Sequence, residues 1–197
     1  MSGYFPNVLI LGHSFVKRLH RDLLSGFDHR AQLDFNLANS AVVHLHGFGG
    51  RTVSQLKEKD LFVISRLVPT LFILEIGTND ILWAGPEVIG SSVVDLVVFI
   101  HDHFQVSVIG VCEVIPRRLP VSDFPNTKFN GEAALLNRYV SVVLSEFSWA
   151  FTWQHRQISS PSSPFLLSDG VHLNPSGQSA LYRSYRGANF RGHACFD

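Results

Sequence analysis

The sequence lacks several features that mark whole classes of protein. Its 2 cysteines in 197 residues are too few for a disulfide framework, and Cys112 lies in an apolar run, VSVIGVC, which is typical of a buried free thiol. Acidic and basic residues balance at 16 each, so the net charge gives no signal for nucleic acid or for an anionic membrane. No window approaches the ~18 consecutive apolar residues of a membrane span.

The N-terminal stretch MSGYFPNVLILGHSF also lacks the basic region and the long apolar stretch of a secretory signal. We therefore expect a soluble, intracellular protein of the cytoplasm. The chain has no internal repeats and no long linker of biased composition. Its length suits one domain, which we place at residues 1–188, with residues 189–197 as a disordered tail.

Signals for strands and helices alternate along the chain. Apolar runs that suit strands buried on both faces recur at intervals of roughly thirty residues: NVLIL (7–11), AVVHL (41–45), TLFILEI (70–76), VSVIGVC (106–112) and WAFTW (149–153). Thr52 and Gln55 form a capping box for a helix over 52–67, and Pro86 suits the first turn of a helix over 85–104. Residues 132–147 and 175–188 behave similarly. This alternation predicts an α/β fold with a largely parallel sheet.

Ligands of open parallel sheets bind beyond the carboxyl ends of the strands, so the residues that follow each strand matter most. After the first strand comes LGHSF, in which Gly12 permits a tight turn and Ser14 begins the next helix. A serine in this place is most simply an N-cap. It is also exposed at the mouth of the sheet, close to the positive end of a helix dipole.

Two further loops carry groups that can stabilise a negative charge. After the second strand, HGFGGRTV contains glycines at 47, 49 and 50, which either make a plain turn or let a backbone N–H approach a substrate oxygen. The loop lacks the lysine and the spacing of a phosphate-binding loop. After the third strand, EIGTND either forms a turn with local hydrogen bonds or presents the Asn79 amide to an oxyanion.

Near the end of the chain, LLSDGVHLNPSGQ places Asp169 and His172 three residues apart in one loop. This separation lets the carboxylate fold back onto the imidazole and fix its tautomer, which leaves the other ring nitrogen to face Ser14 as a base. Each motif alone has a simple structural explanation. Their meeting at one edge of one sheet predicts a serine hydrolase.

In this combination the motifs resemble those of the SGNH hydrolase superfamily, the GDSL-type esterases and lipases. GHS (12–14), GFGGRT (47–52), GTND (77–80) and DGVHLN (169–174) match its blocks in order, and the resemblance runs from residue 8 to about 188. It implies a flavodoxin-like three-layer α/β/α sandwich with a five-stranded parallel sheet, and ester hydrolysis without a metal or a cofactor. The implied catalytic triad is Ser14, His172 and Asp169. The implied oxyanion hole consists of the N–H groups of Ser14 and Gly50 and the amide of Asn79.

One residue departs from the family pattern, because His13 stands where aspartate is usual. This departure motivates a second hypothesis, a catalytically weak or silent module that binds an acylated or glycosylated partner. A third hypothesis, a flavin or nucleotide binder, lacks a phosphate loop. The run DGVHLNPSGQSALYRSYRGA also resembles SGNH-like domains in open reading frames of animal mobile elements. The expected ligand is a small-molecule, lipid or carbohydrate ester.

Other polar and aromatic residues point less clearly to a role. We expect no metal site, because the histidines at 44, 46, 101 and 103 have no convergent ligands. Glu75, inside an apolar strand, needs a buried partner that the sequence does not identify. Arg117 and Arg118 are expected in a solvated loop, with recognition of an acidic substrate as the alternative. The aromatics expected in loops on the same side, either packed or lining an acyl pocket, are Phe48, Trp83, Phe124 and Phe129.

Overall fold

The computed structural model describes residues 6–37, 40–120, 123–160 and 162–195. Its centre is one all-parallel sheet of five strands, in the order β2-β1-β3-β4-β5. The strands are β1 (Asn7–Gly12), β2 (Val42–Gly47), β3 (Leu71–Glu75), β4 (Val108–Cys112) and β5 (Ala150–Trp153). Each predicted apolar run therefore forms a strand. The prediction of a parallel α/β fold of flavodoxin-like order is confirmed.

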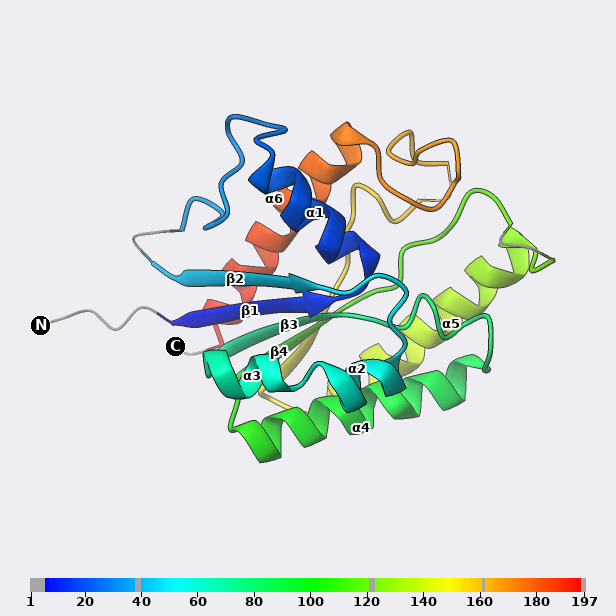
Figure 1. Cartoon of the computed structure of the whole chain (residues 1–197). Coiled ribbons are helices and arrows are strands. Elements are labelled where there is room, and N and C mark those ends of the chain that lie inside the picture. The colour runs from blue at the N-terminus through cyan, green and yellow to red at the C-terminus, as the bar shows by residue number, and fades with distance from the viewer. Residues whose placement is uncertain (1–5, 38–39, 121–122, 161, 196–197) are drawn as a thin grey trace, which may run out of the picture.

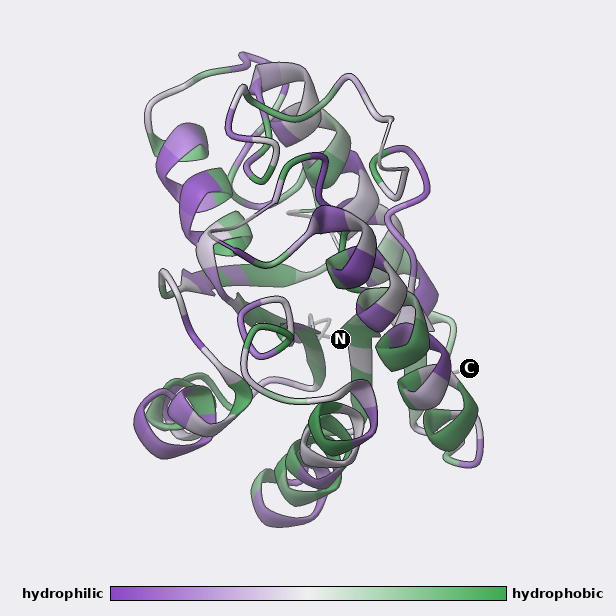
Figure 2. Cartoon of the chain, turned by 90° about the vertical axis from the view of Figure 1, so that its right-hand side faces the viewer, coloured by the Kyte–Doolittle hydropathy of each residue, from purple (hydrophilic) through white to green (hydrophobic). Residues whose placement is uncertain are grey.

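Helices cover both faces of the sheet (Figure 1). One layer holds α1 (Ser14–Leu24) and α6 (Pro175–His193), and the other holds α2 (Val53–Lys59), α3 (Phe62–Leu67), α4 (Pro86–Phe104) and α5 (Asn126–Leu144). Within β1, Val8 and Ile10 pack toward the first layer, whereas Leu9 and Leu11 pack toward the second. Figure 2 colours much of the sheet as hydrophobic, and the central strands β1, β3 and β4 are buried almost throughout. Burial on both faces explains why the strands are continuous apolar runs.

Three helix predictions need correction. The helix predicted over 132–147 instead runs from Asn126 to Leu144 as α5. The predicted helix over 52–67 begins with the expected capping box but breaks at Asp60, where a new helix follows. The buried carboxylate of Asp60 is held there by Arg51, with Nε to Oδ2 at 2.7 Å and Nη2 to Oδ1 at 3.1 Å. The expected tail is also partly wrong, because α6 continues to His193 and Asn189 is fully buried. Residues 196–197 of that tail lie outside the described residues.

Cys112 is a buried free thiol, as predicted. In the part of the chain that the structure describes, no helix combines the length and apolar character needed to cross a membrane.

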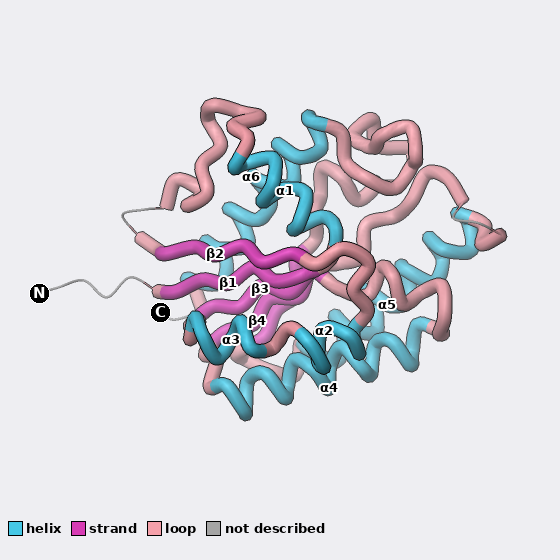
Figure 3. Tube along the Cα trace, in the orientation of Figure 1, coloured by secondary structure: helices cyan, strands magenta, loops and turns pink. Residues whose placement is uncertain are grey.

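The loops that follow the strands gather at the carboxyl edge of the sheet (Figure 3). Gly12 allows β1 to approach β3 closely there, because a Cβ atom at this position would overlap the carbonyl group of Glu75. The N–H of His13 donates to that same carbonyl at 3.2 Å. This tight approach places Ser14, the first residue of α1, directly at the edge of the sheet.

Candidate active site

One cavity collects the predicted site residues. It has a volume of about 580 Å³. Ser14 reaches it from the start of α1, Gly50 from the turn after β2, and Asn79 from the turn after β3, while Asp169 and His172 come from the loop before α6. Segments far apart in the sequence thus meet in one place. A cavity of similar volume, about 570 Å³, lies against β5 and α6, and its described lining includes none of these residues.

The side chains of Asp169 and His172 are held in a defined geometry. Oδ2 of Asp169 accepts a hydrogen bond from Nδ1 of His172 at 2.8 Å, and Oδ1 accepts the backbone N–H groups of Val171 and His172, each at 2.9 Å. Burial raises the pKa of Asp169, but these donors outweigh it and hold the pKa at about 2. The carboxylate is therefore ionised at neutral pH. With Nδ1 bound to it, Nε2 of His172 is left as the basic nitrogen.

Arg118 ties the loop that carries this pair to the rest of the molecule. Its backbone N–H donates to the carbonyl of Gly170 at 2.8 Å, and its Nη2 donates to the carbonyl of Leu167 at 2.7 Å. Inside the loop, the N–H of Leu167 donates to the carbonyl of His172 at 2.7 Å. Arg118 is exposed, as expected of a loop residue, but it also holds the loop in place.

Ser14 is not the N-cap of α1, so its hydroxyl is left available for chemistry. The cap is His13, whose Nδ1 accepts the N–H of Phe15 at 3.4 Å. Within the described ranges, neither the hydroxyl nor the N–H of Ser14 is bound to another residue. The ring of His172 stands edge-on to Phe15, with centroids 6.5 Å apart. This contact places the imidazole near the first turn of α1, although no hydrogen bond joins it to Ser14 among the described residues.

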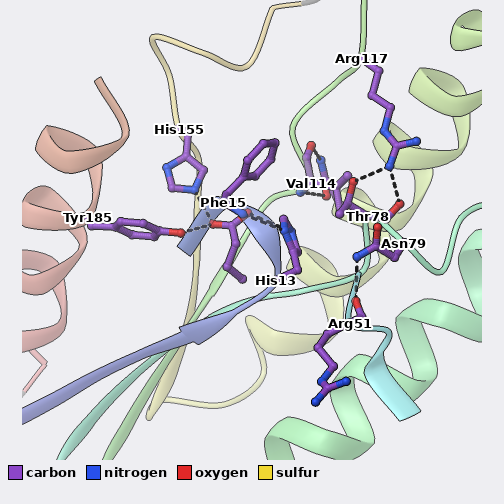
Figure 4. A network of polar contacts seen from close by, with 11 residues as sticks. His13, Phe15, Arg51, Thr78, Asn79, Val114, Arg117, His155 and Tyr185 are labelled. Atoms are coloured by element: carbon purple, nitrogen blue, oxygen red, sulfur yellow. Dashed lines mark hydrogen bonds and ion pairs between the residues drawn. The ribbon is translucent and has the colours of Figure 1, made fainter. Parts of the chain in front are cut away.

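Two further donors lie at the same cavity. Gly50 has φ +72°, a backbone conformation that favours glycine, and its N–H donates to no other described residue. Asn79 donates one proton of its side-chain amide to the carbonyl of Arg51 at 2.9 Å (Figure 4), and the amide carries a second proton. The bond to Arg51 fixes the Asn79 amide beside the turn that contains Gly50.

A buried polar cluster surrounds Glu75, whose partners the sequence did not identify. Figure 4 labels these partners, His13, His155 and Tyr185. Its Oε2 accepts hydrogen bonds from Nε2 of His155 at 2.9 Å and from the hydroxyl of Tyr185 at 2.8 Å. Its Oε1 lies 3.8 Å from Nε2 of His13. Burial raises the pKa of Glu75, but these neighbours outweigh it, so the pKa lies below its ordinary value. His13 thereby links the cap of α1 to a buried carboxylate.

By distance, one group among the described residues could hold a metal ion. It consists of Glu75, Cys112 and His155, whose donor atoms lie within 4.8 Å of one another. Glu75 already accepts two hydrogen bonds there, and Nδ1 of His155 bonds to the hydroxyl of Ser184 at 2.8 Å. Burial raises the pKa of Cys112, which disfavours the thiolate that metals bind. The atoms of Glu75 and His155 that could bind a metal are therefore already engaged in hydrogen bonds.

Arg117 is buried, which corrects the prediction of a solvated loop residue. The residue is 5% exposed. Its Nη2 donates to the carbonyl and hydroxyl of Thr78 at 3.2 and 3.4 Å, and its guanidinium lies 4.0 Å from the ring centroid of Phe129. Burial lowers the pKa of Arg117 to about 10. Phe129 belongs to α5 instead of a loop, and the ring that lines the cavity is that of Phe15. The other predicted pocket aromatics, which lie outside this lining, are Phe48, Trp83 and Phe124.

Acid is expected to destabilise the folded protein through His13. Burial lowers the pKa of His13 from 6.5 to about 4, although the neighbouring Glu75 raises it. Between about pH 6.5 and about pH 4, the unfolded chain therefore binds more protons than the folded chain. Stability is lost as the pH falls through this range. Between about pH 7.5 and about pH 4.5, the loss due to His13 is about 2.5 kcal/mol. Urea unfolding at about pH 7.5 and about pH 4.5 measures it.

The matched variant for this test is His13→Asn, because asparagine caps helices well but does not titrate. On acidification, its stability should fall by about 2.5 kcal/mol less than that of the wild type, because the contribution of His13 is absent. An equal fall in both proteins would show that His13 titrates normally in the folded state.

Comparisons with known proteins bear on the family and the fold of the chain. A family model described as GDSL-like Lipase/Acylhydrolase matches residues 5–184. Among solved structures, a protein described as an acylhydrolase from Bacteroides fragilis superposes with a TM-score of 0.71 at 16% identity, over 93% of this chain and 86% of that one. A GDSL-like lipase from Bacteroides thetaiotaomicron gives 0.70 at 14% identity, over 93% and 87%.

A catalytic serine-to-alanine mutant of an acetylxylan esterase from Geobacillus stearothermophilus gives a TM-score of 0.65 at 16% identity, over 93% of each chain. At these identities the superpositions establish the fold alone. No curated protein matches the chain. The resemblance to domains of mobile elements finds no support in these matches and stays a prediction.

The family assignment rests on the sequence match. It covers all four motif blocks and all five strands of the sheet, and the structural superpositions are consistent with it. The chain therefore belongs to the family of GDSL-like lipases and acylhydrolases.

Proposed function

We propose that the protein is a serine esterase that hydrolyses carboxylic esters whose acyl group is acetyl or another short chain. The observation that carries this proposal is the bond of 2.8 Å between His172 Nδ1 and Asp169 Oδ2, at a cavity that is also lined by Ser14, Gly50 and Asn79. An ionised carboxylate on Nδ1 leaves Nε2 as the base. A free serine hydroxyl at the same cavity is the group that such a base activates.

In the proposed reaction, Ser14 Oγ attacks the ester carbonyl while Nε2 of His172 takes its proton. Asp169 stabilises the resulting imidazolium and keeps the ring in place. The negative charge that develops on the carbonyl oxygen is held by the N–H groups of Ser14 and Gly50 and by the second amide proton of Asn79. His172 then protonates the leaving alcohol. Water resolves the acyl-enzyme by the same steps, with His172 again as the base.

The acetylxylan esterase among the structural neighbours supports the choice of small acyl groups. A catalytically silent module that binds an acylated or glycosylated partner is the competing proposal, since His13 departs from the family pattern. The two proposals differ in one property of Ser14. An esterase requires a nucleophilic hydroxyl, whereas a binding module does not.

Labelling with a fluorophosphonate tests this property directly. We expect one phosphonyl adduct on the tryptic peptide that contains Ser14, with loss of labelling in Ser14→Ala and slow labelling in His172→Gln, because the hydroxyl needs its base. Intact-mass and peptide mass spectrometry measure the adduct. A folded protein whose Ser14 stays unlabelled, and which turns over no aryl acetate, would instead favour the binding module.

A further inference from the structure

The lining of the cavity at the candidate active site contains more basic side chains than the nearby carboxylates neutralise. The basic residues that line it are Lys17, Arg18, Arg21 and Arg117. Arg21 is paired with Asp22 at 2.8 Å, and the one acidic residue in the lining, Asp169, is bound to His172. Among the described residues, no carboxylate oxygen lies within 4.0 Å of the charged nitrogens of Lys17, Arg18 or Arg117.

Arg117 is the least expected of these cations. A buried charge is normally paired with an opposite charge, but the side chain of Arg117 contacts the neutral oxygens of Thr78 and the face of Phe129. Its Nε is buried and has no hydrogen-bond partner in the described structure. A guanidinium that lines a cavity and has no carboxylate partner suits the binding of an oxyanion, because its planar fork matches carboxylate and phosphate groups.

Lys17 supplies a second cation from another element. It lies in the first turn of α1 and is exposed. Its Nζ is 3.9 Å from the position that a Cβ would take on Gly49, so the ammonium group lies along the turn that also contains Gly50. Arg117 reaches the cavity from the segment between β4 and α5. Two elements therefore bring unneutralised positive charge to the same cavity as Ser14.

We propose that Arg117 and Lys17 form an anion-binding subsite, and that the preferred substrates are esters bearing a carboxylate or phosphate group near the scissile bond. This inference rests on the proposed esterase activity of the same cavity. The anion can belong to the acyl part or to the leaving alcohol, and the chemistry of recognition is the same for both. A direct ion pair with Arg117 would also supply the opposite charge that its burial otherwise lacks.

Matched pairs of esters test the subsite at low ionic strength. The first pair, mono-(4-nitrophenyl) succinate and its methyl ester, differs by a carboxylate on the acyl part. The second pair, 4-acetoxyphenyl phosphate and phenyl acetate, differs by a phosphate on the leaving group. After correction for spontaneous hydrolysis, we expect the charged member of at least one pair to have kcat/KM higher by about tenfold or more. Added salt should reduce this preference, because it screens the charges.

Substitutions connect the preference to the subsite. Arg117→Gln should reduce it by about tenfold, and Lys17→Gln, on the exposed side of α1, provides a second variant should Arg117→Gln fail to fold. The matched control is Lys59→Gln, which makes the same change of charge at an exposed position of α2 outside the cavity lining. The control should keep the full preference, so a general effect of net charge is separated from a local one.

The possible outcomes distinguish the subsite from the esterase. Equal turnover of charged and neutral esters, or a preference that survives both substitutions, overturns the subsite and leaves the esterase standing. Absence of turnover for every ester overturns the esterase. In that case, calorimetric titration of 4-acetoxyphenyl phosphate into the Ser14→Ala protein decides the subsite. Binding that is weakened by Arg117→Gln supports it, and absence of binding refutes it.

Discussion

Replacing Ser14 by alanine is expected to lower kcat/KM for a short aryl acetate by at least about 10⁴-fold. The reason is that no covalent acyl-enzyme can form without the hydroxyl, while the donors of the oxyanion hole retain only a small residual catalysis. Stability should change by less than about 0.5 kcal/mol. The cap of α1 is His13, so the alanine removes no capping interaction. Release of the aryl alcohol, followed by absorbance, measures the loss.

A serine on a distant helix supplies the control for this prediction. Ser65 is an exposed residue of α3, so Ser65→Ala makes the same chemical change away from the cavity and should keep full activity. Asp169→Asn should also lose about 10⁴-fold, because the imidazole then lacks the carboxylate that fixes its tautomer. If Ser14→Ala keeps a tenth or more of the wild-type activity, another group is the nucleophile.

The sheet and the positions of the polar motifs could be predicted from the sequence for a simple reason. Strands buried on both faces are continuous apolar runs, and three of the four motifs directly follow such a run, whereas DGVHLN lies in the loop between β5 and α6. The topology of a parallel sheet then brings these motifs to one edge. The spacing of Asp169 and His172 sufficed in the same way to predict their contact, because both lie in one short loop.

The partners of buried polar groups could not be predicted in this way, because they come from distant segments. Glu75 binds His155 and Tyr185, which follow it by 80 and 110 residues. Arg117 follows a strand, in a segment whose composition is that of an ordinary loop. Its burial depends on the packing of α5, which carries Phe129, against it. Only local signals were available from the sequence. A lone acid within an apolar strand indicated that a partner exists but not which residue supplies it.

Removing His155 is expected to destabilise the protein strongly, because it takes a hydrogen-bond donor from a buried carboxylate. Glu75 is 1% exposed and His155 is fully buried, and their bond of 2.9 Å is one of two that Oε2 of Glu75 accepts. His155→Leu fills similar space with an apolar group but leaves the carboxylate with Tyr185 as its direct donor. We expect a loss of about 3–5 kcal/mol in the free energy of unfolding at neutral pH, measured by urea denaturation.

The charge on Glu75 is the cause of this expected loss, and a double-mutant cycle tests that cause. In the background of Glu75→Gln, His155→Leu no longer strands a carboxylate, so its cost should fall to about 1–2 kcal/mol. His29→Leu, at an exposed position, serves as the control and should shift stability by less than about 0.5 kcal/mol. Equal costs of His155→Leu in both backgrounds would mean that His155 stabilises the protein by packing, with no energetic connection to the buried acid.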